Sequence, residues 1–396
     1  MIAHMHVAGK ARFGPGVVSQ VGEIASSLRV KRGVLVTDAS MEEHGYVERV
    51  EKYLQQAGIE CCVFAGVEPE PSVETTDAVA ELAREHECQL VVGLGGGSCL
   101  DVAKAVSMLI TNQGSAAAYQ GLGLVKKPGV PKILIPTTAG TGSEVTFTSV
   151  LIRKSDGVKG GINDDALYAE YCLLDPELTL SLPPFQTAAT GMDALTHALE
   201  AYTSKQATPF SDMFAEEALR RIGRNLRVVT FNGKNLQARS EMLLASYYAG
   251  IALANAGVGA CHALAYPLGG MFGVGHGVAN ALLIPYVVDF SAFGAPEKYA
   301  RAAMLLDFES GEWASLRDRA LLCAEGLHEL VMDLDLPDTL RALKKRKIIS
   351  EYIREDQYPE MAEKALGVAR PMANNPRPCS AEDCVQLYKI ASGEER

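Results

Sequence analysis

QLVVGLGGGSCLDVAKAVSMLI, residues 89–110, joins a strand pattern to a helix pattern through three consecutive glycines. Gln89 to Leu94 form a short apolar run typical of a buried strand, and Ser98 to Ile110 follow a helical pattern. Glycines let the backbone approach a phosphate closely, and the N-terminus of the next helix offers free N–H groups. The stretch therefore predicts a strand–loop–helix unit that binds nucleotide phosphates. A tight glycine turn without a ligand is the simpler alternative.

The glycine loop differs from the common nucleotide-binding fingerprints. Ser98 stands at the sixth position of G-x-G-x-x-G, and no G-K-[ST] of a Walker motif follows a glycine loop. Ser98 with Asp101 three residues later predicts a capping box for the helix.

Strand and helix patterns alternate on both sides of this unit. Further strands are expected at residues 33–38, 61–67 and 132–137, with helical patterns between them. Apolar strands that alternate with helices are typical of a mainly parallel sheet covered on both faces. After two prolines near residues 181–185, apolar residues recur every three or four positions and strand patterns nearly vanish. We therefore predict an α/β domain over residues 1–184 and an all-helical domain over residues 185–396.

Composition excludes several classes of protein. A hydrophobic content of 48% with 21% charged residues is typical of a folded chain, and a net charge of −11 gives no basic surface for nucleic acid. The nine cysteines contain no CxxC pair, and the N-terminus lacks the apolar segment of a signal peptide. The longest apolar run, residues 278–290, is interrupted by polar residues and proline, which disfavours a membrane span. We expect a cytoplasmic protein with no nucleic-acid or membrane partner.

A second polar loop follows the expected strand at residues 132–137. PTTAGTGSEVT, residues 136–146, contains five threonine and serine hydroxyls and two glycines. These groups suit hydrogen bonds to phosphate, ribose or carboxamide. Alone the segment could be a polar turn, but together with the first loop it indicates a dinucleotide site.

Three of the eight histidines lie near an aspartate in the helical half. Asp193 and His197 are four residues apart, so both lie on one face of a helix. His262 and His276 are fourteen residues apart, the second within a glycine-rich turn. Three imidazoles and one carboxylate can complete a site for a divalent ion such as Fe²⁺ or Zn²⁺. Histidines packed in the core without a ligand are the alternative, which these residues alone leave open.

Four motifs in order resemble those of the iron-containing (group III) alcohol dehydrogenases. They are GGGSCLDVAKA, PTTAGTGSEVT, GMDALTHALEAYTS and CHALAYPLGGMFGVGHGVANALLIP. The resemblance spans the chain, including DPELTLSLP (residues 175–183) and NNPRP (residues 374–378). It implies a dehydroquinate synthase-like architecture: a dinucleotide-binding α/β domain, a helical domain, and an active site in the cleft between them. It also implies a homo-oligomer, which we expect to be a dimer.

The same resemblance assigns site residues by motif position. Asp193, His197, His262 and His276 match the family's metal positions. Asp38 matches an acidic position near the adenosine ribose, where a carboxylate accepts from the 2′-OH and repels a 2′-phosphate, so NAD is favoured over NADP. The further cofactor contacts implied are Gly95, Gly96, Gly97, Ser98, Asp101, Thr137, Thr138, Thr141, Ser143, Thr146, Lys159 and Leu178.

The sequence departs from the family at Tyr266. Many members carry a histidine there, which is a plausible proton relay. Tyr266 is four residues from His262 and hence on the same helix face. We predict either that its ring only packs beside the metal or that its phenol joins the proton path as a catalytic group.

The implied reaction is hydride transfer between a small primary alcohol or aldehyde and NAD(H). A divalent ion would lower the pKa of the alcohol hydroxyl, and in reverse it would act as a Lewis acid on the carbonyl. Thr148 and Leu253 match positions that line the family's substrate pocket and favour a short aliphatic substrate. Two alternative functions stay open at this point. A lyase or cyclase of the dehydroquinate synthase kind would need a cluster of lysines and arginines to hold phosphate. A dinucleotide-binding protein without chemistry would not need the four metal ligands.

Overall fold

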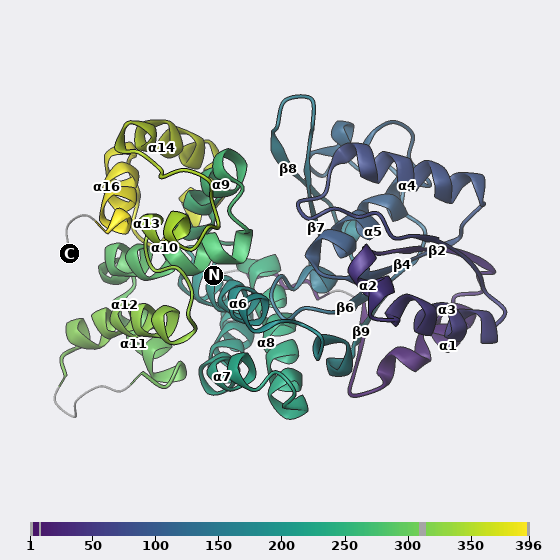
Figure 1. The fold of residues 1–396 in the computed structure, drawn as a ribbon, viewed down its shortest axis with the longest axis horizontal. Coiled ribbons are helices and arrows are strands. Elements are labelled where there is room, and N and C mark those ends of the chain that lie inside the picture. The colour runs from purple at the N-terminus through teal and green to yellow at the C-terminus, as the bar shows by residue number, and fades with distance from the viewer. Residues whose placement is uncertain (1–2, 8, 309–313, 394–396) are drawn as a thin grey trace. The chain divides into compact units, whose positions relative to one another are not determined.

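The chain forms two compact units in a computed structural model that describes residues 3–7, 9–308 and 314–393. Residues 7–182 form an α/β unit, and residues 183–396 with residues 1–6 form a helical unit. In Figure 1 the α/β unit runs from purple through blue to teal, and the helices from α6 onward run from teal to yellow. The units are defined by their packing alone, so a domain boundary at residue 184 stays a prediction.

The α/β unit is built on a six-stranded sheet in the order β1-β9-β6-β4-β2-β3, and every pair in it is parallel. Its strands are β1 (Lys10–Phe13), β2 (Arg32–Val36), β3 (Glu60–Phe64), β4 (Leu90–Gly95), β6 (Lys132–Pro136) and β9 (Tyr171–Leu174). Residues of β4 and β6 are buried throughout, as expected for inner strands covered on both faces. The predicted parallel sheet is confirmed.

A smaller sheet in the same unit has the order β5-β8-β7. It consists of β5 (Gly121–Leu122), β7 (Thr148–Ile152) and β8 (Lys159–Asn163), and β7 pairs antiparallel with β8. The sequence prediction missed this sheet, β1 and β9. The edge strand β1 is mostly exposed, so its sequence KARF lacks the apolar run by which the inner strands were recognised.

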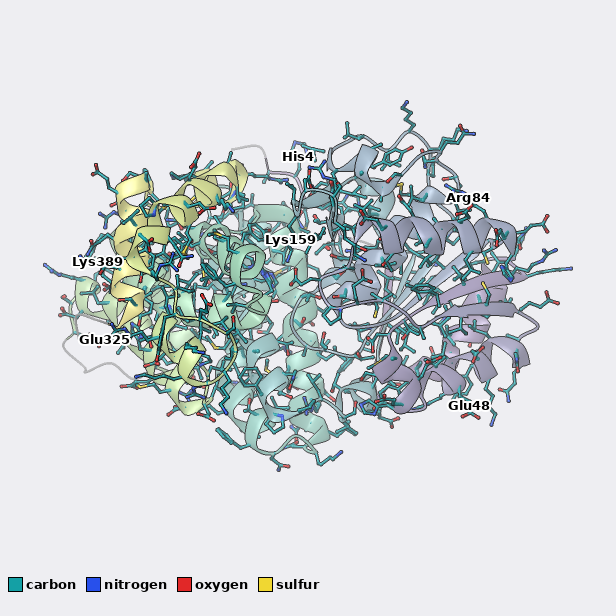
Figure 2. The ribbon with its side chains drawn as sticks, turned by 45° about the horizontal axis from the view of Figure 1, so that its top comes forward. His4, Glu48, Arg84, Lys159, Glu325 and Lys389 are labelled. Carbon is teal, nitrogen blue, oxygen red and sulfur yellow. The ribbon has the colours of Figure 1, made fainter. Side chains whose placement is uncertain are left out.

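Helices cover both faces of the large sheet, with α4 and α5 on one side and α1 and α3 on the other (Figure 1). The helices are α1 (Val21–Ser27), α2 (Ala39–Glu43), α3 (Tyr46–Gln56), α4 (Val73–Glu85) and α5 (Gly97–Leu109). The short 3-10 turns are η1 (Val17–Gln20), η2 (Ala116–Tyr119), η3 (Ser143–Val145), η4 (Asp165–Leu167) and η5 (Pro176–Thr179). Charged side chains such as Glu48 point outward from these helices (Figure 2).

The order of the strands creates a switch point beside β2. The chain passes from β2 outward to β3 and then returns to β4 on the opposite side of β2, where Val36 pairs with Gly93. The loops that follow β2 and β4 therefore leave the same edge of the sheet in opposite directions. Ligands of open α/β sheets bind at the carboxyl ends of strands at such a point.

The helical unit contains α6 to α16, and every described element in it is helical. They are α6 (Pro184–Thr203), α7 (Pro209–Phe231), α8 (Leu236–Ala256), α9 (Ala260–Phe272), α10 (His276–Ser291), α11 (Pro296–Leu305), α12 (Leu316–Asp333), α13 (Leu340–Lys345), α14 (Tyr358–Gly367), α15 (Ala369–Asn374) and α16 (Ala381–Ser392), with η6 (Ala292–Gly294) and η7 (Glu355–Gln357). Helix α6 contacts α7, α8 and α10 and is buried along most of its length. Gly191 permits this packing, because a Cβ there would lie 2.2 Å from Leu226.

Among the described residues, one helical segment, residues 276–294, is long and apolar enough to cross a membrane by composition. The apolar stretch of this segment is 72% buried inside the structure, which is typical of a core helix. The pair α8 and α9 qualifies only when joined across a 105° bend. Both features are weak evidence of a membrane span.

Candidate active site

The four residues predicted as metal ligands lie together in the helical unit. Asp193 and His197 are on α6, His262 is in the first turn of α9, and His276 is the first residue of α10. One potential ligand atom from each lies within 4.8 Å of the other three. The four-residue spacing on α6 aligns the first two side chains, and packing of α9 and α10 supplies the others.

The separations of the ligand atoms suit a metal ion. The Nε2 atoms of His197 and His262 each lie 4.0 Å from Oδ1 of Asp193, and that of His276 lies 3.7 Å from it. A tetrahedral ion with bonds of about 2.1 Å separates its ligands by about 3.4 Å, so small movements of these side chains would close the set around an ion. Three imidazole nitrogens and a carboxylate are ligands that Fe²⁺ and Zn²⁺ both accept. The residues present therefore fit a divalent cation.

The burial of this cluster affects the charge state of Asp193. The side chains of Asp193 and His262 are only 4% and 3% exposed. Burial alone would raise the pKa of Asp193, but the three imidazoles and the Asn280 amide outweigh it and hold the pKa below its ordinary value. The cluster thus favours a buried negative charge, and a bound cation would compensate that charge.

Two polar residues beside the cluster were missed in the sequence analysis. Glu200 accepts from the backbone N–H of Cys261 at 2.6 Å and lies 2.5 Å from Nδ1 of His262. Asn280 donates to Oδ1 of Asp193 at 2.8 Å. Helix spacing could have found both, because Glu200 is three residues after His197 and Asn280 is four residues after His276.

Tyr266 lies beside the cluster, as its spacing from His262 predicts. Its ring stacks on that of His276 with centroids 6.1 Å apart and an angle of 21° between the planes. His276 is the most accessible of the four, with 28% of its side chain exposed. The phenol's part in proton transfer stays a prediction.

The glycine loop lies against the second polar loop within the α/β unit. A Cβ on Gly97 would lie 2.7 Å from the side chain of Thr141, and Gly96 faces Thr138. Gly95 adopts a φ of +144°, which favours glycine, and a Cβ there would also meet Cys99. The structure thus brings the two predicted cofactor loops together.

Helix α5 begins earlier than the sequence predicts. Its N-cap is Gly96, which makes no side-chain cap, so the predicted capping box of Ser98 and Asp101 is wrong. The glycines allow the helix to start directly after β4, and this places Ser98 inside its first turn. The first backbone N–H groups of α5 therefore have no side-chain cap and remain suited to an anion.

Asp101 and the second loop are tied to each other. The carboxylate of Asp101 accepts from the Ser143 hydroxyl at 2.5 Å and from the backbone N–H of Val150 at 2.9 Å. Its other close partner is the ammonium of Lys104, at 3.0 Å. These bonds connect α5, η3 and β7. Cofactor contacts by Asp101 and Ser143 stay predictions, but both side chains already have a structural role.

Lys104, which the sequence analysis passed over, is fully buried. Its ammonium donates to the Ser143 carbonyl at 2.9 Å, to the Thr146 hydroxyl at 3.1 Å and to the Thr148 carbonyl. A buried ammonium with these oxygen partners fixes the second loop against α5. Thr146 thereby joins the same network.

Asp38 lies at the switch point, two residues after the end of β2. Its carboxylate caps α2 by accepting from the backbone N–H groups of Ser40 and Met41. Oδ2 also accepts from the thiol of Cys99 on α5 at 3.2 Å. The residue therefore lies next to the glycine loop, as a ribose contact requires. The contact itself stays a prediction.

The remaining predicted cofactor residues have different surroundings. Thr137 is buried at the end of β6, and its N–H donates to the Gly95 carbonyl at 3.0 Å. Lys159, labelled in Figure 2, pairs with Glu70 from the start of β8. Leu178 is buried in the hydrophobic core of the α/β unit. Their contacts with a cofactor stay predictions.

The second loop contains a buried carboxylic acid. Glu144 is buried, and its Oε1 has no hydrogen-bond partner among the residues that the structure describes. Burial raises its pKa to about 7, although a backbone hydrogen bond and the nearby Lys104 act in the opposite direction. The Cys172 thiol donates to the backbone carbonyl of Glu144 at 2.9 Å.

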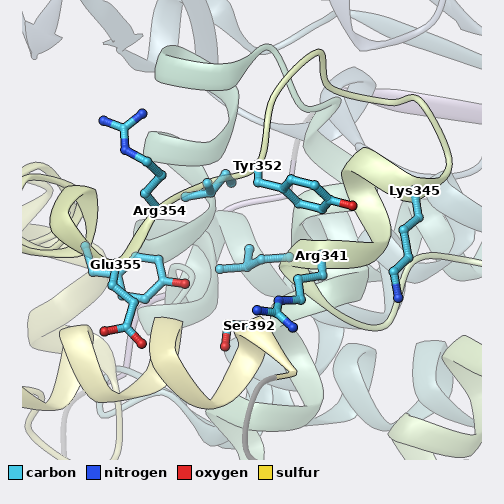
Figure 3. A pocket seen from close by; sticks show the side chains of 9 residues that line it. Arg341, Lys345, Tyr352, Arg354, Glu355 and Ser392 are labelled. Atoms are coloured by element: carbon cyan, nitrogen blue, oxygen red, sulfur yellow. The ribbon is translucent and has the colours of Figure 1, made fainter.

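A cavity of about 540 Å³ opens elsewhere in the helical unit (Figure 3). It is lined by Leu340, Arg341, Lys345, Tyr352, Ile353, Arg354, Glu355, Tyr358 and Ser392. None of these is a predicted site residue. The cavity is therefore separate from the four-residue cluster.

Comparisons with known proteins agree with this arrangement. Residues 8–176 match the family described as iron-containing alcohol dehydrogenase. Residues 187–392 match the C-terminal domain of the Fe-containing alcohol dehydrogenase family.

Individual relatives match over nearly the whole chain. Long-chain-alcohol dehydrogenase 1 of Geobacillus thermodenitrificans (strain NG80-2) is 40% identical, over 96% of this chain and 94% of the relative. NAD-dependent methanol dehydrogenase of Bacillus methanolicus is 32% identical, over 96% and 97%. A crystal structure of 1,3-propanediol oxidoreductase superposes with a TM-score of 0.94 at 38% identity, covering 99% of this chain and 100% of that one.

Proposed function

Because the chain belongs to the iron-containing alcohol dehydrogenase family, we propose that it transfers a hydride between a small primary alcohol or aldehyde and NAD(H) in a metal-dependent reaction. The observation that carries this proposal is the convergence of Asp193, His197, His262 and His276 in the helical unit. Four potential ligand atoms from three helices would be an unfavourable group to bury without a cation.

We propose Fe²⁺ as the resident ion, with Zn²⁺ as the alternative. When bound, the ion polarises the substrate oxygen and NAD(H) accepts or gives the hydride. The four side chains hold the ion. The burial of Asp193 and His262 limits access of water, which strengthens electrostatic interactions at the site.

The α/β unit supplies the cofactor site in this proposal. The uncapped N-terminus of α5 donates backbone N–H groups to the pyrophosphate, and the glycines allow its close approach. Asp38 accepts from the adenosine ribose and disfavours a 2′-phosphate. Lys104 and Asp101 keep the second loop in place beside the glycine loop.

We propose a short primary alcohol or its aldehyde as the substrate. The relatives act on substrates that range from methanol to long-chain alcohols, judging by their names, so family membership leaves the chain length open. The half-buried Thr148 and Leu253 favour a compact aliphatic group. A panel of primary alcohols from methanol to decanol, followed by NADH absorbance, tests this choice. A clear preference for the longest members would contradict it.

Metal analysis with activity measurements tests the function as a whole. We expect that a chelator removes activity and that Fe²⁺ or Zn²⁺ restores it. Alcohol-dependent NADH formation by a rigorously metal-free preparation would contradict the metal-dependent reaction. No NADH formation with any alcohol, and no NADH consumption with any aldehyde, would contradict the proposed activity.

We further propose that the protein is a cytoplasmic homodimer. Helix α7 exposes apolar side chains of Phe210, Met213, Val228 and Phe231, between 43% and 69% of each. Exposed apolar surface of this kind often marks an interface between proteins. Sedimentation at several concentrations tests the dimer, and a monomer throughout would contradict it.

A further inference from the structure

Glu200 makes two short contacts at the edge of the metal cluster without belonging to the four ligands. It is 5% exposed, and His262 is 2% exposed. Oε2 lies 2.5 Å from Nδ1 of His262, and Oε1 accepts from the N–H of Cys261 at 2.6 Å. An ionised carboxylate only accepts hydrogen bonds, so Nδ1 of His262 must be the donor of this pair.

Asn280 gives the same assignment from the opposite side of the ring. Its amide nitrogen donates to Asp193 and lies 3.2 Å from Nε2 of His262. It also lies 3.3 Å from Nε2 of His276. An amide nitrogen can only donate a hydrogen bond, so Nε2 of His262 is the acceptor in this contact. Both neighbours therefore place the proton of neutral His262 on Nδ1 and leave Nε2 unprotonated, 4.0 Å from Oδ1 of Asp193.

We propose that Glu200 is a positioning residue that fixes the tautomer and the ring orientation of His262 before a metal ion binds. This inference rests on the proposed function, because it assigns Nε2 of His262 as a ligand atom. Carboxylates that accept from the second ring nitrogen of a metal-binding histidine orient the ring and raise its basicity. Glu200 thus acts on the ion only through His262.

The second contact of Glu200 is a structural role that the test must separate. Cys261 lies in the first turn of α9, whose N-cap, Gly259, has no side-chain cap. Oε1 of Glu200 therefore satisfies a backbone N–H at the start of that helix. Removing the whole side chain would disturb α9 and His262 together.

Glu200→Gln separates the two roles. A glutamine at this position has one oxygen and one NH₂ group. If its oxygen keeps the bond to Cys261, the NH₂ group faces Nδ1 of His262 and can only donate to it. His262 would then carry its proton on Nε2. A proton there blocks the lone pair that would bind a metal ion, and it repels the N–H groups of the Asn280 amide. The fold of α9 would be preserved.

The first measurement is ¹⁵N NMR of metal-free protein labelled at histidine, at a pH well above the usual imidazole pKa of about 6.5. The His262 signals are assigned by their absence in His262→Gln. We expect protonated Nδ1 and bare Nε2 in the wild type, and the reverse in Glu200→Gln. Protonated Nε2 in the wild type, or no change in the variant, would overturn the inference.

The second measurement is the Zn²⁺ dissociation constant by chelator competition. Loss of a carboxylate partner of this kind weakens metal binding by about 10–100-fold. Glu216→Gln is the matched control, because Glu216 accepts from the Tyr202 hydroxyl at 2.9 Å and is not one of the cluster residues. We expect its affinity to equal that of the wild type, with similar unfolding temperatures for both variants. Equal affinity of Glu200→Gln and wild type would overturn the inference.

The two measurements also separate this inference from the proposed function. Absence of Zn²⁺ and Fe²⁺ binding in the wild type would contradict the metal-dependent function. The tautomer of His262 in metal-free protein would still decide whether Glu200 positions the ring.

Discussion

The helical unit and the α/β unit present the residues for their proposed ligands in different ways. In the helical unit the predicted side chains converge on one another, with ligand atoms within 4.8 Å. In the α/β unit Asp101 and Ser143 bond to each other, and Asp38 caps α2. The first backbone N–H groups of α5 have no side-chain cap from Gly96, and we propose that they bind the phosphates. The proposed metal site is therefore built from side chains, whereas the proposed cofactor site would use mainly backbone N–H groups.

The largest expected effect comes from the side-chain half. His262→Ala or His276→Ala should reduce kcat roughly a thousandfold or more, because a metal ion contributes several kcal/mol to stabilising the transition state. The dissociation constant of NAD should change little, because both cofactor loops belong to the α/β unit. Steady-state kinetics with calorimetric NAD titration measures both. Unchanged kcat in both variants would show that these histidines do not hold a catalytic metal ion.

Lys104→Met should weaken NAD binding indirectly, because Lys104 holds the second polar loop against α5. Removing one partner of a buried ion pair costs about 3–5 kcal/mol of stability, because the other charge is left buried. NAD should bind more weakly while Zn²⁺ binding stays unchanged. Lys132→Met is the control, since Lys132 is also buried but pairs with Glu170, the residue before β9. Equal losses of NAD affinity in both variants would mean that Lys104 has no specific role in the loops.

Glu144→Gln tests whether the second loop contains a buried charge that costs stability. The pKa of Glu144 is raised to about 7 in the folded protein from 4.5, so folding favours its protonated form. That stability is present below pH 4.5 and is lost as pH rises through about 7. The variant should therefore gain about 3 kcal/mol over wild type at pH 8 relative to pH 4. Unfolding by urea at both pH values measures this, and a gain independent of pH would contradict the assignment.

Substitutions of Asp38 test the predicted contact with the adenosine ribose, which would set the preference for NAD over NADP. Asp38→Asn removes the charge and keeps a good helix N-cap, so kcat/KM with NADP should rise by about tenfold or more. Asp38→Gly should raise NADP use as well, at some cost in stability from the lost cap. Equal kcat/KM of the wild type with NAD and NADP would show that Asp38 does not contact the ribose.

Tyr266→Phe has the smallest expected effect. The ring stacking on His276 survives the change, so kcat should fall by less than about threefold if packing is the main role of the residue. A pH–rate profile of wild type, Tyr266→Phe and Tyr266→His decides between packing and proton transfer. A large loss in Tyr266→Phe that Tyr266→His restores near neutral pH would assign the phenol to the proton path.

The same contrast explains how much the sequence could predict. The inner strands and the long helices follow from apolar periodicity, and Asp193 and His197 from helix spacing. The edge strand β1 and the small β5-β8-β7 sheet lack that periodicity and were missed. The roles of Lys104 and Glu200 depend on partners 39 and 62 residues away, which no local pattern specifies. Sequence motifs predicted the two cofactor loops but could not show that Asp101 is already bonded to Ser143 and Val150.

The most direct test of the account is metal binding by five variants of the metal-stripped protein. Asp193→Ala, His197→Ala, His262→Ala and His276→Ala each remove one member of the cluster, and His44→Ala removes an exposed histidine of the α/β unit. We predict that wild type and His44→Ala bind one ion per chain and regain alcohol dehydrogenase activity in proportion to it. The four cluster variants should bind weakly and stay inactive. Full activity of metal-free wild type, or tight binding by all five variants, would contradict the central claim.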